Sequence, residues 1–105
     1  MASRIQQLQE FINEDPSDPF NIYALALEYQ KSDLQKAIET FNQLLSSHPD
    51  YVPTYYQLGK IYQDLSQDKK ALSVFETGIV KAGNQHNSKA LHELQAARQE
   101  LLSDY

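Results

Sequence analysis

Residues 20–41 read FNIYALALEYQKSDLQKAIETF, and residues 53–75 read PTYYQLGKIYQDLSQDKKALSVF. A shift of 33 residues places four residues of the first stretch on identical residues of the second: Tyr23, Leu25, Tyr29 and Gln30 fall on Tyr56, Leu58, Tyr62 and Gln63. A shift of 34 does the same later in the stretch: Ser32, Lys36, Ala37 and Phe41 fall on Ser66, Lys70, Ala71 and Phe75. Since a turn tolerates one extra residue cheaply, the two shifts indicate a tandem repeat with a turn inside each unit.

Apolar residues recur at helical spacing on both sides of each turn. In the first unit the two stripes are Ile22, Leu25, Ala26 and Tyr29, then Ile38, Phe41, Leu44 and Leu45. In the second they are Leu58, Ile61, Tyr62 and Leu65, then Leu72, Phe75, Ile79 and Val80. The pattern predicts an all-α chain in which each unit is a pair of antiparallel helices.

Residues typical of helix starts support these predicted helices. Asp18 precedes Pro19, which suggests an N-cap followed by a proline in the first turn, where a missing N–H costs nothing. Ser32 with Gln35 predicts a capping box for the next helix. Pro53 is expected to open the first helix of the second unit.

The flanks of the repeats are also predicted to be helical. A shift of 33 places five residues of the N-terminal flank on the second helix of the first unit: Ile5, Leu8, Phe11, Ile12 and Pro16 fall on Ile38, Phe41, Leu44, Leu45 and Pro49. Residues 3–14 therefore look like the second helix of an incomplete preceding repeat. Residues 88–102 carry Leu91, Leu94, Ala97, Leu101 and Leu102 on one side, and we interpret them as a capping helix entered through a turn at 82–87.

These residues resemble the tetratricopeptide repeat, a helix–turn–helix unit of about 34 residues. The first unit matches its pattern with Ile22, Leu25, Ala26, Tyr29, Ala37, Phe41 and Pro49, and the second with Tyr55, Leu58, Gly59, Tyr62, Ala71 and Phe75. The resemblance implies a right-handed superhelical stack of antiparallel helix pairs with about six helices. We expect a single domain over residues 1–105, divided into a half-repeat (1–18), two repeats (19–51 and 52–85) and a capping helix (86–105).

The resemblance also implies a function, because such arrays typically bind extended peptides in a concave groove lined by the first helix of each pair. Transferred to this sequence, it predicts a protein-binding adaptor whose partner is another protein or peptide. The groove residues would be Phe20, Tyr23, Leu27 and Gln30 from one helix, and Pro53, Tyr56, Lys60 and Gln63 from the next. The repeated pair Tyr23 and Tyr56 leaves two interpretations open, since these rings would either contact a ligand or pack against neighbouring helices.

Chaperone-binding members of the family hold a C-terminal carboxylate with lysine and asparagine side chains on these faces. The corresponding positions here are Tyr23, Leu27 and Gln57, so this clamp is absent. A groove with tyrosine, leucine and phenylalanine side chains and one lysine, Lys60, favours a mostly apolar peptide or helix.

Two glycines are expected to serve packing and chain reversal. Gly59 lies inside a predicted helix, where glycine costs about 1 kcal/mol relative to alanine. That cost is explained if the paired helix passes very close, with Ala71 as the expected neighbour. Gly83 suits a left-handed exit from the second helix of the second unit.

Charge and composition exclude several functions. The net charge of the chain is −5, and residues 1–50 hold three basic residues against eight acidic ones. No basic face is present to displace counterions from nucleic acid or to bind an anionic membrane. No apolar run approaches the roughly 20 residues of a membrane span. Cysteine is absent, which is compatible with a reducing cytosol, and we expect a cytoplasmic protein.

Signals for catalysis or metal binding are missing from the sequence. His86 and His92 are six residues apart, which does not place two ligands on one helical face, and His48 lies at a helix end. No glycine-rich phosphate loop, nucleophile elbow or HExxH motif occurs. We therefore expect no enzyme activity, no cofactor and no metal site.

A second functional class remains open from the sequence. Two repeats form a short array, and apolar surface on either flanking helix could be buried in a homodimer, which would make the chain a self-associating structural module. The sequence does not name the partner or the pathway. The initiating Met1 and the helices at both ends favour a free-standing product over an excised domain.

Overall fold

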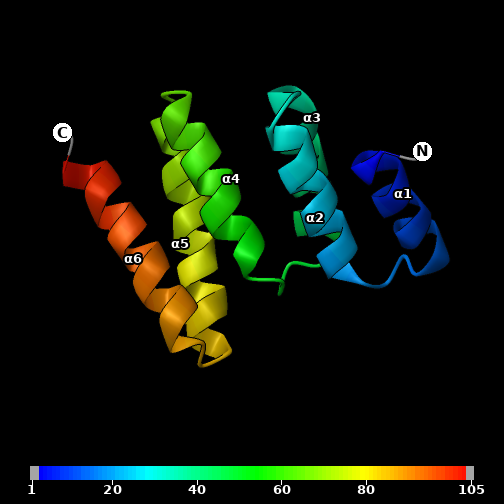
Figure 1. Ribbon diagram of the computed structural model, residues 1–105. Helices are drawn as coiled ribbons and strands as arrows, with labels where there is room; N and C mark the ends of the chain where they lie inside the picture. The colour runs from blue at the N-terminus through cyan, green and yellow to red at the C-terminus, as the bar shows by residue number, and fades with distance from the viewer. Residues whose placement is uncertain (1–2, 104–105) are drawn as a thin grey trace. The chain divides into compact units, whose positions relative to one another are not determined.

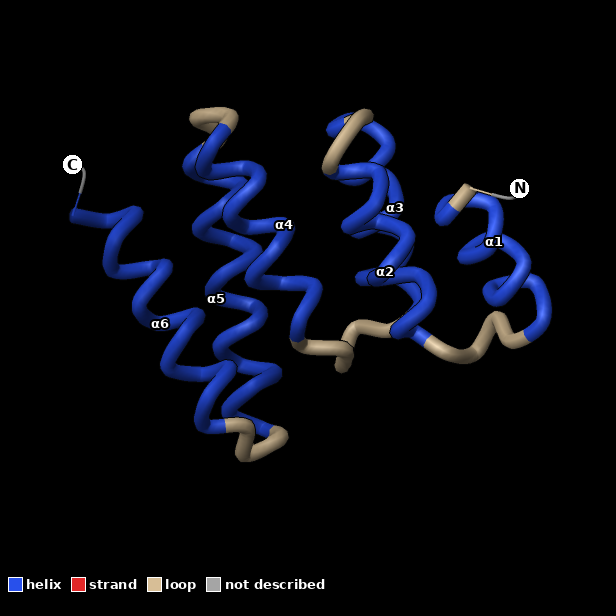
Figure 2. Tube along the Cα trace, in the orientation of Figure 1, coloured by secondary structure: helices blue, strands red, loops and turns tan. Residues whose placement is uncertain are grey.

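The computed structural model describes residues 3–103 and confirms the predicted all-α fold. Within these residues the chain forms six α-helices and no strand (Figure 1, Figure 2). The helices are α1 (Arg4–Glu14), α2 (Pro19–Gln30), α3 (Leu34–Ser47), α4 (Pro53–Asp64), α5 (Asp68–Asn84) and α6 (Ser88–Ser103). Each helix lies where the apolar periodicity predicts one, and the predicted ends agree to within three residues.

The helices form two compact units, Met1–Tyr51 (unit 1) and Val52–Tyr105 (unit 2). In unit 1, α2 packs against both α1 and α3. In unit 2, α5 packs against α4 and α6, and α6 also contacts α4. The division falls between the two repeats found in the sequence.

The core of each unit consists mainly of residues from the predicted stripes. Unit 1 buries Leu8, Leu25, Ala26, Ala37, Phe41 and Leu44. Unit 2 buries Tyr55, Leu58, Ile61, Tyr62, Ala71, Phe75, Leu94, Ala97 and Leu101. Leu65, Val80 and Leu102 were predicted on apolar stripes but are exposed, because Leu65 lies just after the end of α4 and the other two lie at the margins of their stripes.

Two glycines allow the helices of unit 2 to approach closely. A Cβ atom added at Gly59 would overlap the ring of Phe75, so the expectation that Ala71 lies opposite Gly59 was wrong. A Cβ atom at Gly78 of α5 would lie 2.6 Å from the Cβ atom of Tyr55, a second close approach that the sequence did not indicate. Glycine at these positions is therefore required by the neighbouring side chains.

The helix starts agree with the sequence in two of three places. Asp18 caps α2, since its Oδ1 atom accepts a hydrogen bond of 2.9 Å from the Phe20 N–H, and α4 opens at Pro53. The capping box predicted at Ser32 was wrong. Asp33 is the N-cap of α3, and its Oδ1 atom accepts from the Lys36 N–H at 3.2 Å. Serine and aspartate are both good N-caps, so the sequence alone did not decide between these adjacent residues.

The left-handed residue after α5 is His86, with a φ of 55°, and not Gly83. Gly83 lies inside α5, which continues to Asn84. The turn between α5 and α6 is therefore shorter than the predicted 82–87. It is closed by hydrogen bonds from the Asn87 N–H to the Ala82 carbonyl and from the His86 N–H to the Gly83 carbonyl.

The two repeats share a cation–π contact as well as identical residues. The Nζ atom of Lys36 lies 5.6 Å from the centre of the Tyr29 ring, and that of Lys70 lies 5.6 Å from the Tyr62 ring. In both units a lysine near the start of the second helix lies over a tyrosine near the end of the first. Each cation–π contact links the two helices of its pair across the turn.

Three aromatic rings contact one another in unit 1. The Tyr23 ring meets Phe41 edge-on at 6.1 Å between centroids and meets Tyr51 in the same way at 5.6 Å. Burial raises the pKa of the Tyr51 phenol above its ordinary value of 10.0, and the phenol of Tyr23 and the carboxylate of Asp18 raise it further. The folded state of unit 1 therefore favours the neutral form of Tyr51.

Replacement of Gly59 with alanine is expected to destabilise the chain by about 1–3 kcal/mol, because the new methyl group overlaps the Phe75 ring. Gly83→Ala is the matched control. No atom lies within 4 Å of a Cβ at Gly83, so alanine there gains helix propensity and stabilises by about 0.5 kcal/mol. Urea unfolding of both variants measures the difference, and equal effects of the two substitutions would contradict this packing.

The raised pKa of Tyr51 predicts a pH dependence of stability. As the pH rises above about 10, the unfolded state loses the phenolic proton first, so the free energy of unfolding falls. Tyr51→Phe keeps the ring and removes this titration. The stability of the wild type relative to Tyr51→Phe should fall as the pH rises past about 10 in urea unfolding. A constant difference would show that Tyr51 titrates normally in the folded state.

Candidate functional site

The residues predicted to bind a partner lie on α2 in unit 1 and on α4 in unit 2. On α2, Phe20 and Gln30 are exposed, while Tyr23 and Leu27 are half-buried. On α4, Tyr56, Lys60 and Gln63 are half-buried, and Pro53 is exposed. Each helix thus presents a mixed apolar and polar face within its own unit.

Phe20 and Tyr23 have different environments although they lie one turn apart on α2. The Tyr23 ring is packed between Phe41 and Tyr51, so it contributes to the stability of unit 1. Phe20 is 56% exposed, and only its backbone N–H makes a hydrogen bond, to the N-cap Asp18. Among the predicted binding residues of α2, Phe20 is therefore the large apolar side chain that is most accessible to a partner.

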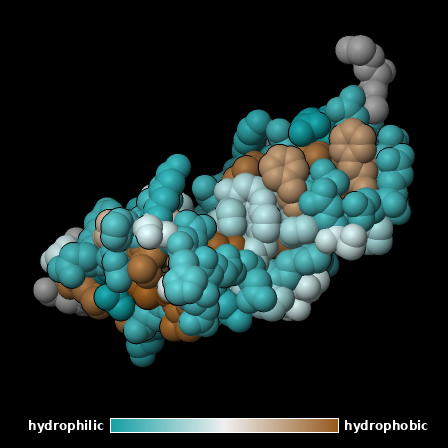
Figure 3. Space-filling model, turned by 90° about the horizontal axis from the view of Figure 1, so that it is seen from below, coloured by the Kyte–Doolittle hydropathy of each residue, from teal (hydrophilic) through white to brown (hydrophobic). Residues whose placement is uncertain are grey.

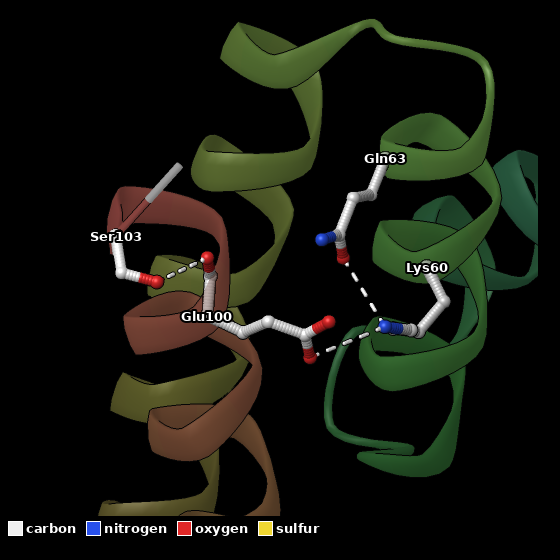
Figure 4. Close-up of polar contacts among 4 residues, drawn as sticks. All are labelled: Lys60, Gln63, Glu100 and Ser103. Atoms are coloured by element: carbon white, nitrogen blue, oxygen red, sulfur yellow. Dashed lines mark hydrogen bonds and ion pairs between the residues drawn. The ribbon is translucent and has the colours of Figure 1, made fainter. Parts of the chain in front are cut away.

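Lys60 lies at the centre of a small polar group in unit 2 (Figure 4). Its Nζ atom donates a hydrogen bond of 3.2 Å to Oε1 of Gln63 and lies 3.7 Å from Oε2 of Glu100 on α6. The Lys60 side chain is 29% exposed and that of Glu100 is 63% exposed. An ion pair this open to water contributes little stability, but it partly neutralises the charge of Lys60.

The sequence missed Glu100 as a neighbour of the predicted site. Its place on α6 is set by the packing of that helix, which buries Leu94, Ala97 and Leu101 and contacts α4 as well as α5. Glu100 itself has no distinguishing motif. The face of α4 in unit 2 is therefore bordered by α6.

Hydrophobic side chains at the surface are mixed with hydrophilic ones on the face seen in Figure 3. The exposed large hydrophobic residues of unit 1 are Phe11, Phe20 and Leu34, and those of unit 2 are Leu65, Val80 and Leu102. Val80 is the most exposed of them, at 61%, and lies on α5 rather than on a first helix of a repeat.

Residues 3–103 contain no group of three histidine, aspartate or glutamate side chains placed to hold a metal ion. His48 caps the end of α3, His86 lies in the turn before α6, and His92 is exposed on α6. None of the six helices in this part of the chain has both the length and the apolar character needed to cross a membrane.

Three solved structures illustrate what this chain is similar to. The crystal structure of a tetratricopeptide repeat domain protein from Salinibacter ruber is 39% identical, with a TM-score of 0.79 over 84% of this chain and 100% of that one. The solution structure of a tetratricopeptide repeat domain protein from the same organism is 42% identical, with a TM-score of 0.78 over 83% and 89%. The TPR2B domain of yeast Sti1, in a complex with pHsp70, has a TM-score of 0.84 over 96% and 82%, and at 17% identity it shows a common fold alone.

The comparison with curated proteins gave no significant match. Two family models described as the tetratricopeptide repeat match the sequence in tandem, at residues 22–51 and 52–79. Together they span the helix pairs α2–α3 and α4–α5, apart from the first residues of α2 and the last of α5. From these matches and from the Salinibacter ruber relatives, the chain belongs to the tetratricopeptide repeat family.

Proposed function

We propose that this chain is an adaptor that binds a peptide or helix of a partner protein along the outward faces of α2 and α4, the helices that open the two repeats. Tetratricopeptide repeat domains generally mediate protein–protein interactions. The TPR2B domain of yeast Sti1, which has the same fold, is in a complex with pHsp70. This similarity supports a polypeptide as the ligand. The kind of peptide is inferred below from the side chains on the two faces.

The exposed ring of Phe20 is the observation that carries the proposal. A phenylalanine that is 56% exposed leaves apolar area in water that a partner can cover. Aromatic side chains of this kind are frequent anchors in protein interfaces. Among the described residues no aromatic ring contacts Phe20 as Phe41 and Tyr51 contact Tyr23, so the exposed part of the Phe20 ring is available to a partner.

The α4 face supports an apolar peptide over a free carboxylate as the ligand. Lys60 already has Gln63 and Glu100 as partners, so an added anion would compete with a carboxylate that is in place. Tyr56, one turn before Lys60, adds an amphipathic ring beside this polar group. Tyr23, Leu27 and Gln57 stand where chaperone-binding members carry clamp residues, which argues for a ligand other than a chaperone tail.

Self-association is the alternative, because a second copy could also cover Phe20. Sedimentation equilibrium of the wild type and of Phe20→Ser distinguishes the two. A dimer that Phe20→Ser dissociates would replace the adaptor proposal with a homodimeric module. A monomer in both cases leaves the face free for another protein.

Two substitutions on α2 are expected to have different effects on stability. Tyr23→Ala removes a ring packed on Phe41 and Tyr51 and should cost about 1–3 kcal/mol. Phe20→Ser removes an exposed ring and should change the free energy of unfolding by less than about 0.5 kcal/mol. Urea unfolding provides the measurement, and a large loss for Phe20→Ser would mean that this ring serves packing after all.

Phe20→Ser is therefore the suitable variant for a binding experiment, and Val80→Ser is its matched control, since both remove an exposed apolar side chain. Affinity capture from a lysate of the source cells is run with the wild type and both variants. The proposal predicts a protein retained by the wild type and by Val80→Ser but reduced at least about tenfold by Phe20→Ser. Equal retention by all three proteins would place binding on another surface.

A further inference from the structure

Unit 1 contains a pocket on the side of α2 away from Phe20 and Tyr23. It has a volume of about 370 Å³ and is lined by residues of α1, α2, α3 and the loop after α1: Gln9, Ile12, Asn13, Pro16, Ile22, Leu25, Thr40, Gln43 and Ser47. Ile22 and Leu25 each follow a residue of the Phe20 face by two positions, which is about 200° around a helix. The pocket is therefore separate from the surface proposed above.

The lining of the pocket is partly aliphatic and contains no charged side chain. Ile12, Ile22 and Leu25 supply aliphatic surface. The hydroxyl of Thr40 donates to the Lys36 carbonyl at 2.8 Å, and that of Ser47 donates to the Gln43 carbonyl at 3.0 Å. With both hydroxyl protons used inside α3, the pocket suits an apolar side chain.

Amide side chains lie beside this aliphatic surface. Gln9, Asn13 and Gln43 line the pocket from α1 and α3. The Nε2 atom of Gln9 already donates to the Tyr29 hydroxyl at 3.3 Å. An amide both donates and accepts hydrogen bonds, so Asn13 and Gln43 can pair with the N–H and C=O groups of an incoming backbone. The volume lies at the small end of the range for ligand pockets, which favours one anchoring side chain over a large ligand.

The basic residues of unit 1 lie at one end of its helices, while acidic residues lie at both ends, since Glu28 is in the last turn of α2 and Asp33 is the N-cap of α3. Helices α1 and α3 run opposite to α2 (Figure 1). The residues that line the pocket therefore lie toward the ends of α1 and α3 and the start of α2. The basic residues of unit 1 lie at the opposite end, at the start of α1, just after α2 and in the first turn of α3: Arg4, Lys31 and Lys36.

The pocket end of unit 1 is acidic. Glu14 ends α1, Asp15 and Asp18 follow it in the loop, and Asp50 follows α3. The C-terminal ends of α1 and α3 add partial negative charge at the same end, which outweighs the partial positive charge of the single N-terminus there, that of α2. A ligand that reaches the pocket from this end therefore meets a negative potential, which attracts lysine and arginine side chains.

We propose that this pocket binds a basic segment of a partner protein, with one apolar side chain seated on Ile12, Ile22 and Leu25 and neighbouring lysine or arginine residues beside Glu14 and Asp15. The net charge of unit 1 favours a basic partner over a second copy of unit 1. Residues 1–50 carry eight acidic and three basic residues, so two such units repel each other.

Nuclear magnetic resonance tests this proposal at the level of single residues, and a chain of 12.1 kDa suits the method. The probes are three capped peptides, Lys-Lys-Gly-X-Gly-Lys-Lys with X as leucine, methionine or phenylalanine, titrated to about 1 mM. At least one should shift the backbone amides of Ile12, Leu25 and Ser47. The peptide with alanine at X, and the leucine peptide with glutamate for lysine, should shift them several-fold less.

The results that would overturn the pocket proposal differ from those that would overturn the adaptor function proposed above. Shifts confined to α2 near Phe20 or to α4 would support the adaptor face and overturn the pocket proposal. No shift with any of the three peptides, or equal shifts with the alanine peptide, would also overturn it. Shifts of the pocket amides that depend on protein concentration without peptide would assign the pocket to a second copy.

Two variants check the roles of charge and of the cavity. Glu14→Lys suits the end of a helix and should weaken peptide binding about threefold, while Glu76→Lys on α5 makes the same change of charge in unit 2 and should leave the Kd unchanged. Ser47→Phe places a ring at the pocket rim from an exposed position and should abolish the shifts. Unchanged binding in both Glu14→Lys and Ser47→Phe would contradict the proposal.

Discussion

Close packing of the paired helices is the constraint on which each repeat depends. In unit 2, α4 approaches α5 so closely that Gly59 leaves room only for the ring of Phe75, and Gly78 meets Tyr55 in the same way. The corresponding position of unit 1 is Ala26, which is fully buried, as is Phe41. Both pairs thus bury a small residue on the first helix and a phenylalanine on the second, and in unit 2 the contact of these two residues determines which sides of α4 and α5 face inward.

This inward packing decides which residues remain for binding. On α2, Leu25 and Ala26 are buried, and Phe20 is left exposed on another side of the helix. Tyr23 lies between these extremes, since its ring completes an aromatic group with Phe41 and Tyr51. Side chains on one helix thus divide into those that hold the unit together and those that a partner can reach, and only the latter are informative about function.

Unit 1 offers two surfaces of different chemistry. The Phe20 face of α2 is aromatic, whereas the pocket between α1, α2 and α3 is partly aliphatic, has amide side chains and lies at an acidic end of the unit. The antiparallel order of the helices places Arg4, Lys31 and Lys36 at the end away from the pocket, because it gathers residues near the starts of α1 and α3 with those at the end of α2. A partner with both apolar and basic segments could use the two surfaces at once, which would raise the effective concentration of each contact.

The sequence by itself determined the two repeats, the six helices, most of the core and the start of α2 at Asp18, because these follow from periodicity and capping between residues close along the chain. Only the tertiary structure decided that Phe75 faces Gly59, that Tyr23 packs on Tyr51, that Glu100 lies beside Lys60, and that a pocket forms in unit 1. The three side-chain contacts join residues 16, 28 and 40 positions apart. They depend on how each helix is rotated and at what angle it crosses its neighbour. A periodic pattern shows which face of a helix is buried, but it does not show which residue of another helix that face contacts.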